Sequence, residues 1–454
     1  MELRRWLDTA VDEIEKWQAG YGEFASHPST AVGESEFGSA FAELVDRLRD
    51  NYPFFHPRYA GQMLKPPHPA AVAGQLAAML VNPNNHAMDG GPATARMERE
   101  VVEQLAAVVG YGPAHLGHLT TSGTVANLEA LFVARETHPG RAVAHSTEAH
   151  YTHARMCHLL GVESVPVTTD GAGRMDLGAL EAELRTGRIG TVVVTAGTTG
   201  LGAVDPVHEV LPLCAEHGAR VHVDAAYGGF FRLIADDSAD GVAAAPFEAI
   251  AACDSVVVDP HKHGLQPYGC GAVLFADPSV GRFYKHDSPY TYFTSADLHL
   301  GEISLECSRA GAAAAALWLT FRVLPPTAEG LGRVLRPGRR AALRWTELME
   351  QSSALAPYQR PELDIVTYFP RARRLSEIDR ISAQVMEKGM TAPAEEAVFL
   401  ATCGVTAPAM AARGHEVDAD VPSGRILRSV LMKPEHDDWL GDLHSRVEAL
   451  VRAA

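Results

Sequence analysis

Short apolar runs alternate with helix-like windows through the middle of the chain, and this alternation constrains the fold more than any other feature. From Leu116 onward, strand-like runs are separated by windows of helical pattern such as residues 124–135. This pattern is typical of a mostly parallel sheet with helices on both faces. We therefore expect an α/β fold whose sites lie beyond the carboxyl ends of the strands. The strand-like runs are residues 141–145, 164–167, 191–195, 221–224, 255–258 and 272–275.

Helical patterns precede this part of the chain. Apolar residues recur every three or four positions over residues 3–17, which predicts an amphipathic helix whose apolar stripe needs a partner. Two further helices are predicted around residues 70–80 and 95–109. The polar positions of the second are assigned to Glu98, Arg99, Glu100 and Glu103.

The same patterns predict three domains. Residues 1–70 are typical of a helical arm, and residues 71–325 of a large domain with a mostly parallel sheet. Residues 326–454 predict a small C-terminal α+β domain with strand-like segments at 363–369 and 425–432.

Composition excludes several classes of protein. The 454 residues are 46% hydrophobic and 21% charged, which suits a sizeable core and excludes a disordered, collagen-like or coiled-coil chain. A formal charge of −17 disfavours binding of nucleic acid. No run is long and apolar enough to span a bilayer, so we expect a soluble, cytoplasmic protein without membrane contact. The six scattered cysteines form no Cys-x-x-Cys pair and predict neither a zinc site nor a disulfide framework.

A lysine follows one of the predicted buried strands. In Asp259-Pro260-His261-Lys262-His263, it comes shortly after the apolar run 255–258. A desolvated amine at the mouth of a parallel sheet is a candidate for forming a Schiff base. The alternative is a solvated lysine in a turn.

Two further segments place polar groups at the ends of predicted elements. Asp224 ends a strand and could hold a proton on a ring nitrogen, while Ala226 is small enough for a flat ring to lie against it. The alternative for Asp224 is a helix cap. Ser122, Gly123 and Thr124 begin a predicted helix, where backbone N–H groups suit a phosphate or where the helix is capped without a ligand.

A histidine and a threonine complete the set of candidates. His150 follows the run 141–145, and an imidazole there could stack on an aromatic cofactor. Thr199 lies in the turn after the run 191–195. Each residue by itself is more typical of a structural role, since the chain has 21 histidines and many turns.

The order of these segments resembles that of the group II pyridoxal-phosphate-dependent amino acid decarboxylases, whose fold type I architecture implies a mostly parallel, seven-stranded sheet in the large domain. Five motifs follow the family's order: a small-hydroxyl helix start, a strand-end histidine, a threonine-rich turn, a strand-end aspartate and a strand-end lysine. The resemblance extends from about His56 to Pro325. Residues 56–63, 82–85 and 305–312 are similar to the bacterial tyrosine decarboxylase-like branch.

The resemblance implies a role for each matching residue. Lys262 would carry pyridoxal 5'-phosphate as a Schiff base, and Asp224 would pair with the pyridinium nitrogen. His150 would stack on the ring face opposite Ala226. The other cofactor contacts implied by the family are Ser122, Gly123 and Thr124 at the phosphate, with Asp259 and His261 nearby, and Thr199 near the ring oxygen or the lysine.

The resemblance also implies a proton donor on a loop over residues 284–309. Tyr290 and His299 are the catalytic candidates, with Tyr292 as a third. In relatives, loss of this acid is associated with oxidative deamination to an aldehyde. The residues expected to line the substrate pocket are Tyr59, Gln62, Met63, Asn84, Asn85 and His86, with Arg428 as a candidate for binding a carboxylate.

These inferences predict a homodimeric enzyme that decarboxylates an L-amino acid to the amine and CO2, with the arm 1–70 at the dimer seam. An aromatic substrate such as tyrosine is favoured. The alternatives are an acidic substrate, an aminoacyl group on a carrier protein, an aldehyde synthase or carbon–carbon lyase on the same scaffold, and a scaffold protein without cofactor.

Overall fold

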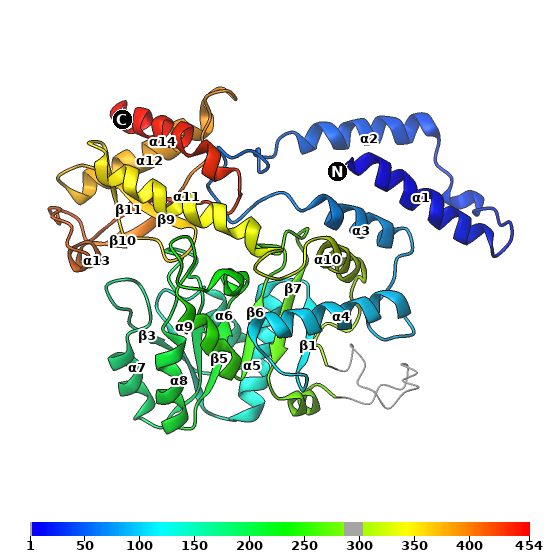
Figure 1. The fold of residues 1–454 in the computed structure, drawn as a ribbon, viewed down its shortest axis with the longest axis horizontal. Helices are drawn as coiled ribbons and strands as arrows, with labels where there is room; N and C mark the ends of the chain where they lie inside the picture. The colour runs from blue at the N-terminus through cyan, green and yellow to red at the C-terminus, as the bar shows by residue number, and fades with distance from the viewer. Residues whose placement is uncertain (1, 286–302) are drawn as a thin grey trace.

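A seven-stranded sheet forms the centre of the large domain (Figure 1). The computed structural model describes residues 2–285 and 303–454. The strand order is β1-β7-β6-β5-β4-β2-β3, and only β7 runs antiparallel to its neighbours. The predicted α/β fold with a mostly parallel, seven-stranded sheet is therefore confirmed. The strands are β1 (Leu116–Thr120), β2 (Ala142–Ser146), β3 (Ser164–Val167), β4 (Ile189–Thr195), β5 (Arg220–Asp224), β6 (Ser255–Val258) and β7 (Gly271–Phe275).

Helices cover both faces of this sheet, because successive strand residues point to opposite sides. Along β4, Val192 and Val194 pack in one core cluster with α7 and α8, whereas Val193 packs with α5 and α6. The elements around the sheet are α3 (Pro69–Met79), α4 (Pro92–Val109), α5 (Gly123–Thr137), α6 (Thr152–Leu160), α7 (Leu177–Leu184), α8 (Val207–Glu216), η2 (Gly229–Ile234), α9 (Ala244–Glu248), η3 (Ala249–Ala252), η4 (Pro278–Phe283) and α10 (Ala312–Val323).

The C-terminal part forms a second layer against the large domain (Figure 1). Its antiparallel sheet has the order β10-β11-β9-β8. The strand-like segments expected at 363–369 and 425–432 correspond to β9 and β11, whereas the domain boundaries at 70 and 325 stay predictions. The elements are α11 (Gly332–Gln351), β8 (Leu355–Pro357), β9 (Ile365–Pro370), α12 (Leu375–Thr391), β10 (Ala401–Thr406), α13 (Ala407–Ala412), β11 (Ser423–Val430) and α14 (His436–Arg452).

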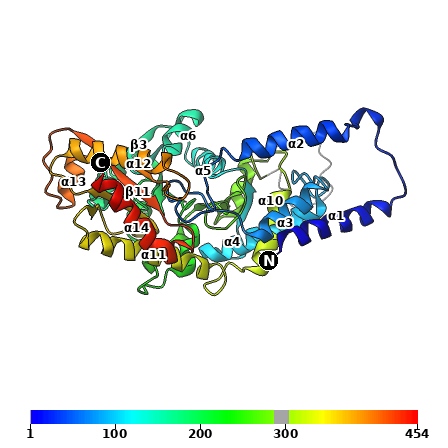
Figure 2. The same ribbon diagram turned by 90° about the horizontal axis from the view of Figure 1, so that it is seen from above.

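The N-terminal helices extend from one end of the molecule (Figure 2). The helix expected over 3–17 is α1 (Leu3–Ala19), followed by η1 (Pro28–Thr30) and by α2 (Glu34–Leu48), which we did not predict. α1 contacts α3, and neither α1 nor α2 has a buried residue. Within the described residues, no helix is both long and apolar enough to cross a bilayer.

Helix α4 departs from its prediction in one respect that affects the core. Glu98, which we assigned to the polar side of this helix, is buried. Its Oε1 lies 2.9 Å from Nη1 of Arg309, and its Oε2 accepts a hydrogen bond of 2.6 Å from Asn85. A carboxylate can be buried in this way because a cation and hydrogen-bond donors compensate for its lost hydration.

Candidate active site

The carboxyl ends of four parallel strands meet at one cavity. β2, β4, β5 and β6 are neighbours in the sheet, and the polar segments that follow them line a cavity of ≈ 240 Å³ together with the start of α5. All ten residues predicted for the cofactor line it: Ser122, Gly123, Thr124, His150, Thr199, Asp224, Ala226, Asp259, His261 and Lys262. The same wall contains Asn127, Tyr151, Thr152, Thr195, Gly197 and Tyr227.

Helix α5 presents its first turn to this cavity. Ser122 caps the helix, because its Oγ accepts a hydrogen bond of 3.3 Å from the backbone N–H of Val125. A Cβ atom at Gly123 would lie 2.5 Å from Oδ2 of Asp259, so the helix start approaches this loop closely only without a side chain. The N–H groups of a first helical turn carry partial positive charge and suit an anion such as phosphate.

Lys262 lies in the loop after β6, with its amine at the cavity. Its Nζ lies 3.1 Å from Oδ2 of Asp259, and the side chain is 20% exposed. The ring of His261 is fixed beside it, since Nδ1 lies 2.7 Å from the carbonyl oxygen of Cys270. Asp259 Oδ1 is buried and has no hydrogen-bond partner among the described residues. The lysine amine is therefore held by a carboxylate and remains accessible from the cavity.

Asp224 ends β5 and is almost completely buried. Its Oδ1 accepts a hydrogen bond of 3.2 Å from the backbone N–H of Ala226, and its Oδ2 accepts one of 2.8 Å from Nε2 of His153. Burial alone would raise the pKa of Asp224. The hydrogen bond and charge of His153, together with the charge of Lys262, instead lower this pKa below its ordinary value. Asp224 is thus an ionised carboxylate at neutral pH.

His150 and Thr199 reach the cavity from the loops after β2 and β4. Nδ1 of His150 accepts a hydrogen bond of 3.3 Å from the backbone N–H of Thr152, which fixes the ring. Burial lowers the pKa of His150, so the neutral ring is favoured. The turn that carries Thr199 depends on Gly197, whose φ of +98° is a conformation that favours glycine.

Among the described residues, the predicted substrate set does not line this cavity. Tyr59 is buried against Phe399, and Asn85 is bound to Glu98. Gln62 is exposed. The remaining members that lie elsewhere are Met63, Asn84 and His86.

Arg428 also lies outside the cavity wall but contacts the loop that carries Thr199. Its Nε donates a hydrogen bond of 3.1 Å to the carbonyl oxygen of Gly200. Its Nη2 is buried and has no partner in the part of the chain that the structure describes. The substrate role of all these residues stays a prediction. Tyr290, Tyr292 and His299 lie outside the described residues.

Sequence reasoning missed His153 and the six further residues of the cavity wall, of which Tyr227 is one. Tyr227 lines the cavity, and His153 binds Asp224 from behind. His153 gave no local signal, because its partner Asp224 lies 71 positions away in the sequence. The acceptor of the Tyr227 hydroxyl is Asp364, which is distant in the sequence and gave no local signal.

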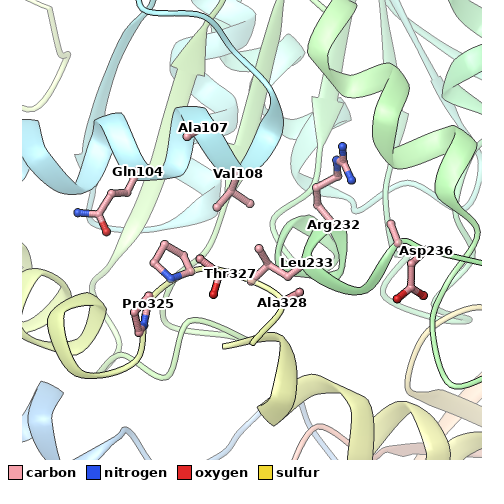
Figure 3. Close-up of a pocket in the computed structure, with 11 residues that line it drawn as sticks. Gln104, Ala107, Val108, Arg232, Leu233, Asp236, Pro325, Thr327 and Ala328 are labelled. Carbon is pink, nitrogen blue, oxygen red and sulfur yellow. The ribbon is translucent and has the colours of Figure 1, made fainter. Parts of the chain in front are cut away.

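A larger cavity of ≈ 590 Å³ lies elsewhere (Figure 3). Ala107 and Val108 of α4, Leu233 of η2 and the loop after α10 line it. None of the predicted site residues borders this second cavity, as far as the structure describes them. The chemistry that the sequence predicts therefore belongs to the smaller cavity at the strand ends.

Comparison with known proteins identifies the family. Residues 54–368 match the family described as pyridoxal-dependent decarboxylase conserved domain. The chain belongs to this family. The decarboxylase is 28% identical to the L-tyrosine decarboxylase of Enterococcus faecium, over 83% of this chain and 80% of the relative. It is 34% identical to a probable L-aspartate decarboxylase of Halobacterium salinarum, over 59% of this chain and 72% of the relative.

Solved structures share the fold of the decarboxylase. Mouse CSAD matches with a TM-score of 0.79 at 21% identity, over 99% of this chain and 98% of that one. The Oryza sativa TDC with PLP and tryptamine matches with the same TM-score of 0.79 at 19% identity, again over 99% and 98% of the two chains. The fold type I architecture is therefore confirmed.

The cavity of the decarboxylase fits pyridoxal 5'-phosphate. It combines a helix start for a phosphate, a buried ionised carboxylate for a ring nitrogen and an accessible amine for a carbonyl carbon. Buried oxygens without a partner among the described residues, such as Thr195 Oγ1 and Asp259 Oδ1, remain available to a bound group. When bound, this cofactor supplies the electron sink for breaking the bond to a carboxylate. The enzyme is an amino acid carboxy-lyase that uses pyridoxal 5'-phosphate.

Proposed function

We propose that the decarboxylase acts on a free aromatic L-amino acid such as L-tyrosine. The observation that carries this proposal is the similarity to L-tyrosine decarboxylases over most of both chains. The Enterococcus faecium enzyme aligns over 83% of this chain, and the Levilactobacillus brevis enzyme aligns over 80% at 26% identity. The probable L-aspartate decarboxylase of Halobacterium salinarum aligns over a smaller part, 59% of the chain.

We propose the following roles in the cavity, which the family and the positions of the side chains support. Lys262 provides the amine that bonds to the cofactor, and its position 3.1 Å from Asp259 supports this role. The carboxylate of Asp224 would hold the proton on the ring nitrogen, which would keep the ring electron-poor. His150 would cover the ring and exclude water, and Ala226 would leave room for it. Ser122, Gly123 and Thr124 bind the phosphate, and Thr199, His261 and Asp259 complete the wall.

An acidic L-amino acid is the second candidate substrate. Nη2 of Arg428 is buried without a partner among the described residues, and burial lowers the pKa of this guanidinium. An unpaired buried cation is costly, and a substrate carboxylate would compensate for this cost. The side chain also contacts the loop that carries Thr199.

A substrate panel separates the two candidates. The purified protein with pyridoxal 5'-phosphate is given L-tyrosine, L-phenylalanine, L-tryptophan, L-aspartate or L-glutamate, and release of CO2 and amine is measured. We expect the highest kcat/KM with tyrosine. A Lys262→Ala variant should lose both the visible absorbance band and CO2 release.

The Arg428→Met variant provides the matched test of the second candidate. If an acidic amino acid is the substrate, this variant should raise its KM while the visible band of the cofactor stays. Preference for aspartate in the wild type contradicts the aromatic proposal. A visible band without CO2 from any free amino acid contradicts both candidates and favours a carrier-bound substrate or cleavage of another bond.

We also propose that the enzyme is a cytoplasmic homodimer joined through its N-terminal arm. The apolar side chains of α1 and α2 support the dimer, because Trp17 is 50% and Phe37 62% exposed within one chain. All six cysteines are free thiols, which is typical of a reducing compartment.

A further inference from the structure

A buried histidine lies behind the carboxylate that faces the cavity. His153 belongs to the first turn of α6, and its side chain is fully buried. Its Nε2 lies 2.8 Å from Oδ2 of Asp224. Because an ionised carboxylate only accepts hydrogen bonds, Nε2 carries the proton and His153 donates. The bond joins α6 to the end of β5 and fixes the orientation of the carboxylate.

The hydrogen bonds of His153 differ from those of its two buried neighbours. His145 uses both ring nitrogens, at 2.9 Å from Ser146 O and 2.8 Å from Ser164 Oγ. His222 likewise uses both, toward the side chains of Ser255 and Asn127. Nδ1 of His153 has no hydrogen-bond partner in the described part of the chain. Among the described residues, Asp224 is therefore the only hydrogen-bond partner of the His153 ring.

The bond also decides which oxygen of Asp224 is available. Oδ2 is occupied by His153, whereas Oδ1 accepts only a longer bond of 3.2 Å from the backbone N–H of Ala226. Ala226 and Asp224 both line the cavity. Oδ1 of Asp224 is therefore the oxygen that can accept a further hydrogen bond from a group in the cavity, whereas Oδ2 is held by His153.

We propose that His153 is a positioning residue that keeps Asp224 ionised and aimed at the ring nitrogen of the cofactor. The inference rests on the proposed role of Asp224. Charged-acceptor hydrogen bonds are about twice as strong as neutral ones, and their geometry is correspondingly well defined. Removing the donor leaves a carboxylate that is desolvated and held by weaker contacts.

The surroundings of Asp224 predict how this loss depends on pH. Burial favours the protonated acid, and the hydrogen bond of His153 is the largest opposing contribution. The pKa of His222 is lowered to about 3 by burial, so this ring is neutral in the working range. The other titratable groups that face the pair are Lys262, His150, Asp259 and His145. Without His153, the pKa of Asp224 should rise, and cofactor binding should weaken most at acidic pH.

The test measures the affinity of the apoenzyme for pyridoxal 5'-phosphate between pH 5.5 and 8.5. His153→Leu removes the donor, His153→Gln retains an N–H donor of similar reach, and His145→Gln is the matched control on a buried ring that does not bind Asp224. We expect His153→Leu to raise Kd about tenfold or more at neutral pH, and further below pH 6.5. His153→Gln should recover most of the affinity at neutral pH, and His145→Gln should bind like the wild type.

Each other result contradicts the inference. Equal Kd values for His153→Leu and the wild type across the pH range exclude a positioning role, provided that Asp224→Ala binds weakly. An equal loss in the Leu and Gln variants without pH dependence indicates that only the shape of the ring matters. If His153→Leu does not fold, His153→Asn, whose amide is too short to reach Asp224, is measured in its place. Wild-type affinity in Asp224→Ala would instead overturn the proposed role of Asp224 itself.

Discussion

Asp364 connects the C-terminal domain to the residues beside Lys262. The hydroxyl of Tyr227 donates a hydrogen bond of 2.5 Å to Oδ1 of Asp364, and Nε2 of His263 lies 3.3 Å from Oδ2. All three side chains are buried. Burial raises the pKa of Asp364 to about 6, although the hydrogen bond from Tyr227 and the charge of Lys65 oppose this rise. Tyr227, which lines the cavity, thus connects it to the Asp364 carboxyl, whose pKa is raised to about 6.

The Asp364→Asn substitution should change how stability depends on pH. A carboxyl with a raised pKa in the folded state contributes its full stability below its unfolded pKa, and this contribution is lost as pH rises through about 6. Between pH 4.5 and 7.5, the unfolding free energy of the wild type should fall relative to the variant by about 2 kcal/mol. Urea denaturation of both proteins at the two pH values measures this difference. The exposed Asp438→Asn is the control, and a pH-independent difference for Asp364→Asn would contradict the prediction.

The turn between β1 and α5 is clamped by the segment that precedes α10. Glu306 accepts hydrogen bonds from the backbone N–H (2.9 Å) and hydroxyl (2.6 Å) of Thr121, which directly precedes the helix cap Ser122. Arg309 lies 2.9 Å from Glu98 and also donates to the carbonyl oxygen of Leu119. These contacts hold the start of α5, and with it the proposed phosphate site, against α4. The local sequence favours a helix at α5, whereas contacts from distant segments determine where the start of this helix lies in the structure.

The Arg309→Met substitution should destabilise the fold by about 3–5 kcal/mol, because it leaves the buried Glu98 without its cation. Adding Glu98→Gln should recover part of this loss, since the remaining buried group is then neutral. Arg322→Met is the matched control, because Arg322 pairs with Glu100 of the same helix at an exposed position and should cost less than about 1 kcal/mol. Equal losses in the two arginine variants, measured by urea denaturation, would refute the clamp.

The N-terminal arm exposes apolar side chains that a single chain does not bury. Helices α1 and α2 have no buried residue, and their aromatic side chains face outward. An apolar groove of ≈ 820 Å³ lies at the root of the arm, between the end of α2 and Phe399. Exposed apolar side chains that gather in one region mark sites of interaction. The proposed homodimer would bury it.

The substitution of both Phe37 and Phe41 by Ser should weaken the dimer without unfolding the chain, because these stacked rings are 62% and 54% exposed. We expect the wild type to sediment at twice the 48.7 kDa of one chain and the double variant to shift toward the monomer. Leu159→Ser, on the exposed side of α6, should leave the mass unchanged. A monomeric wild type, or a double variant that sediments like it, would refute the proposal.

The α/β class could be predicted from the sequence, because short apolar runs and helical windows are local properties of the chain. The sequence also predicted that the candidate cofactor residues lie together. In a parallel sheet, chain segments that follow successive strands emerge at one edge, so His150, Thr199, Asp224 and Lys262 were bound to converge.

The hydrogen-bond and ion-pair partners of the supporting residues depend on tertiary packing. The bond between His153 and Asp224 joins positions 71 residues apart, and that between Tyr227 and Asp364 joins positions 137 apart. The burial of Glu98 depends equally on Arg309, from a distant segment. No local pattern specifies such pairs, because each depends on how whole elements pack. The sequence therefore indicated the groups that line the cavity, whereas packing determined the groups that hold them in place.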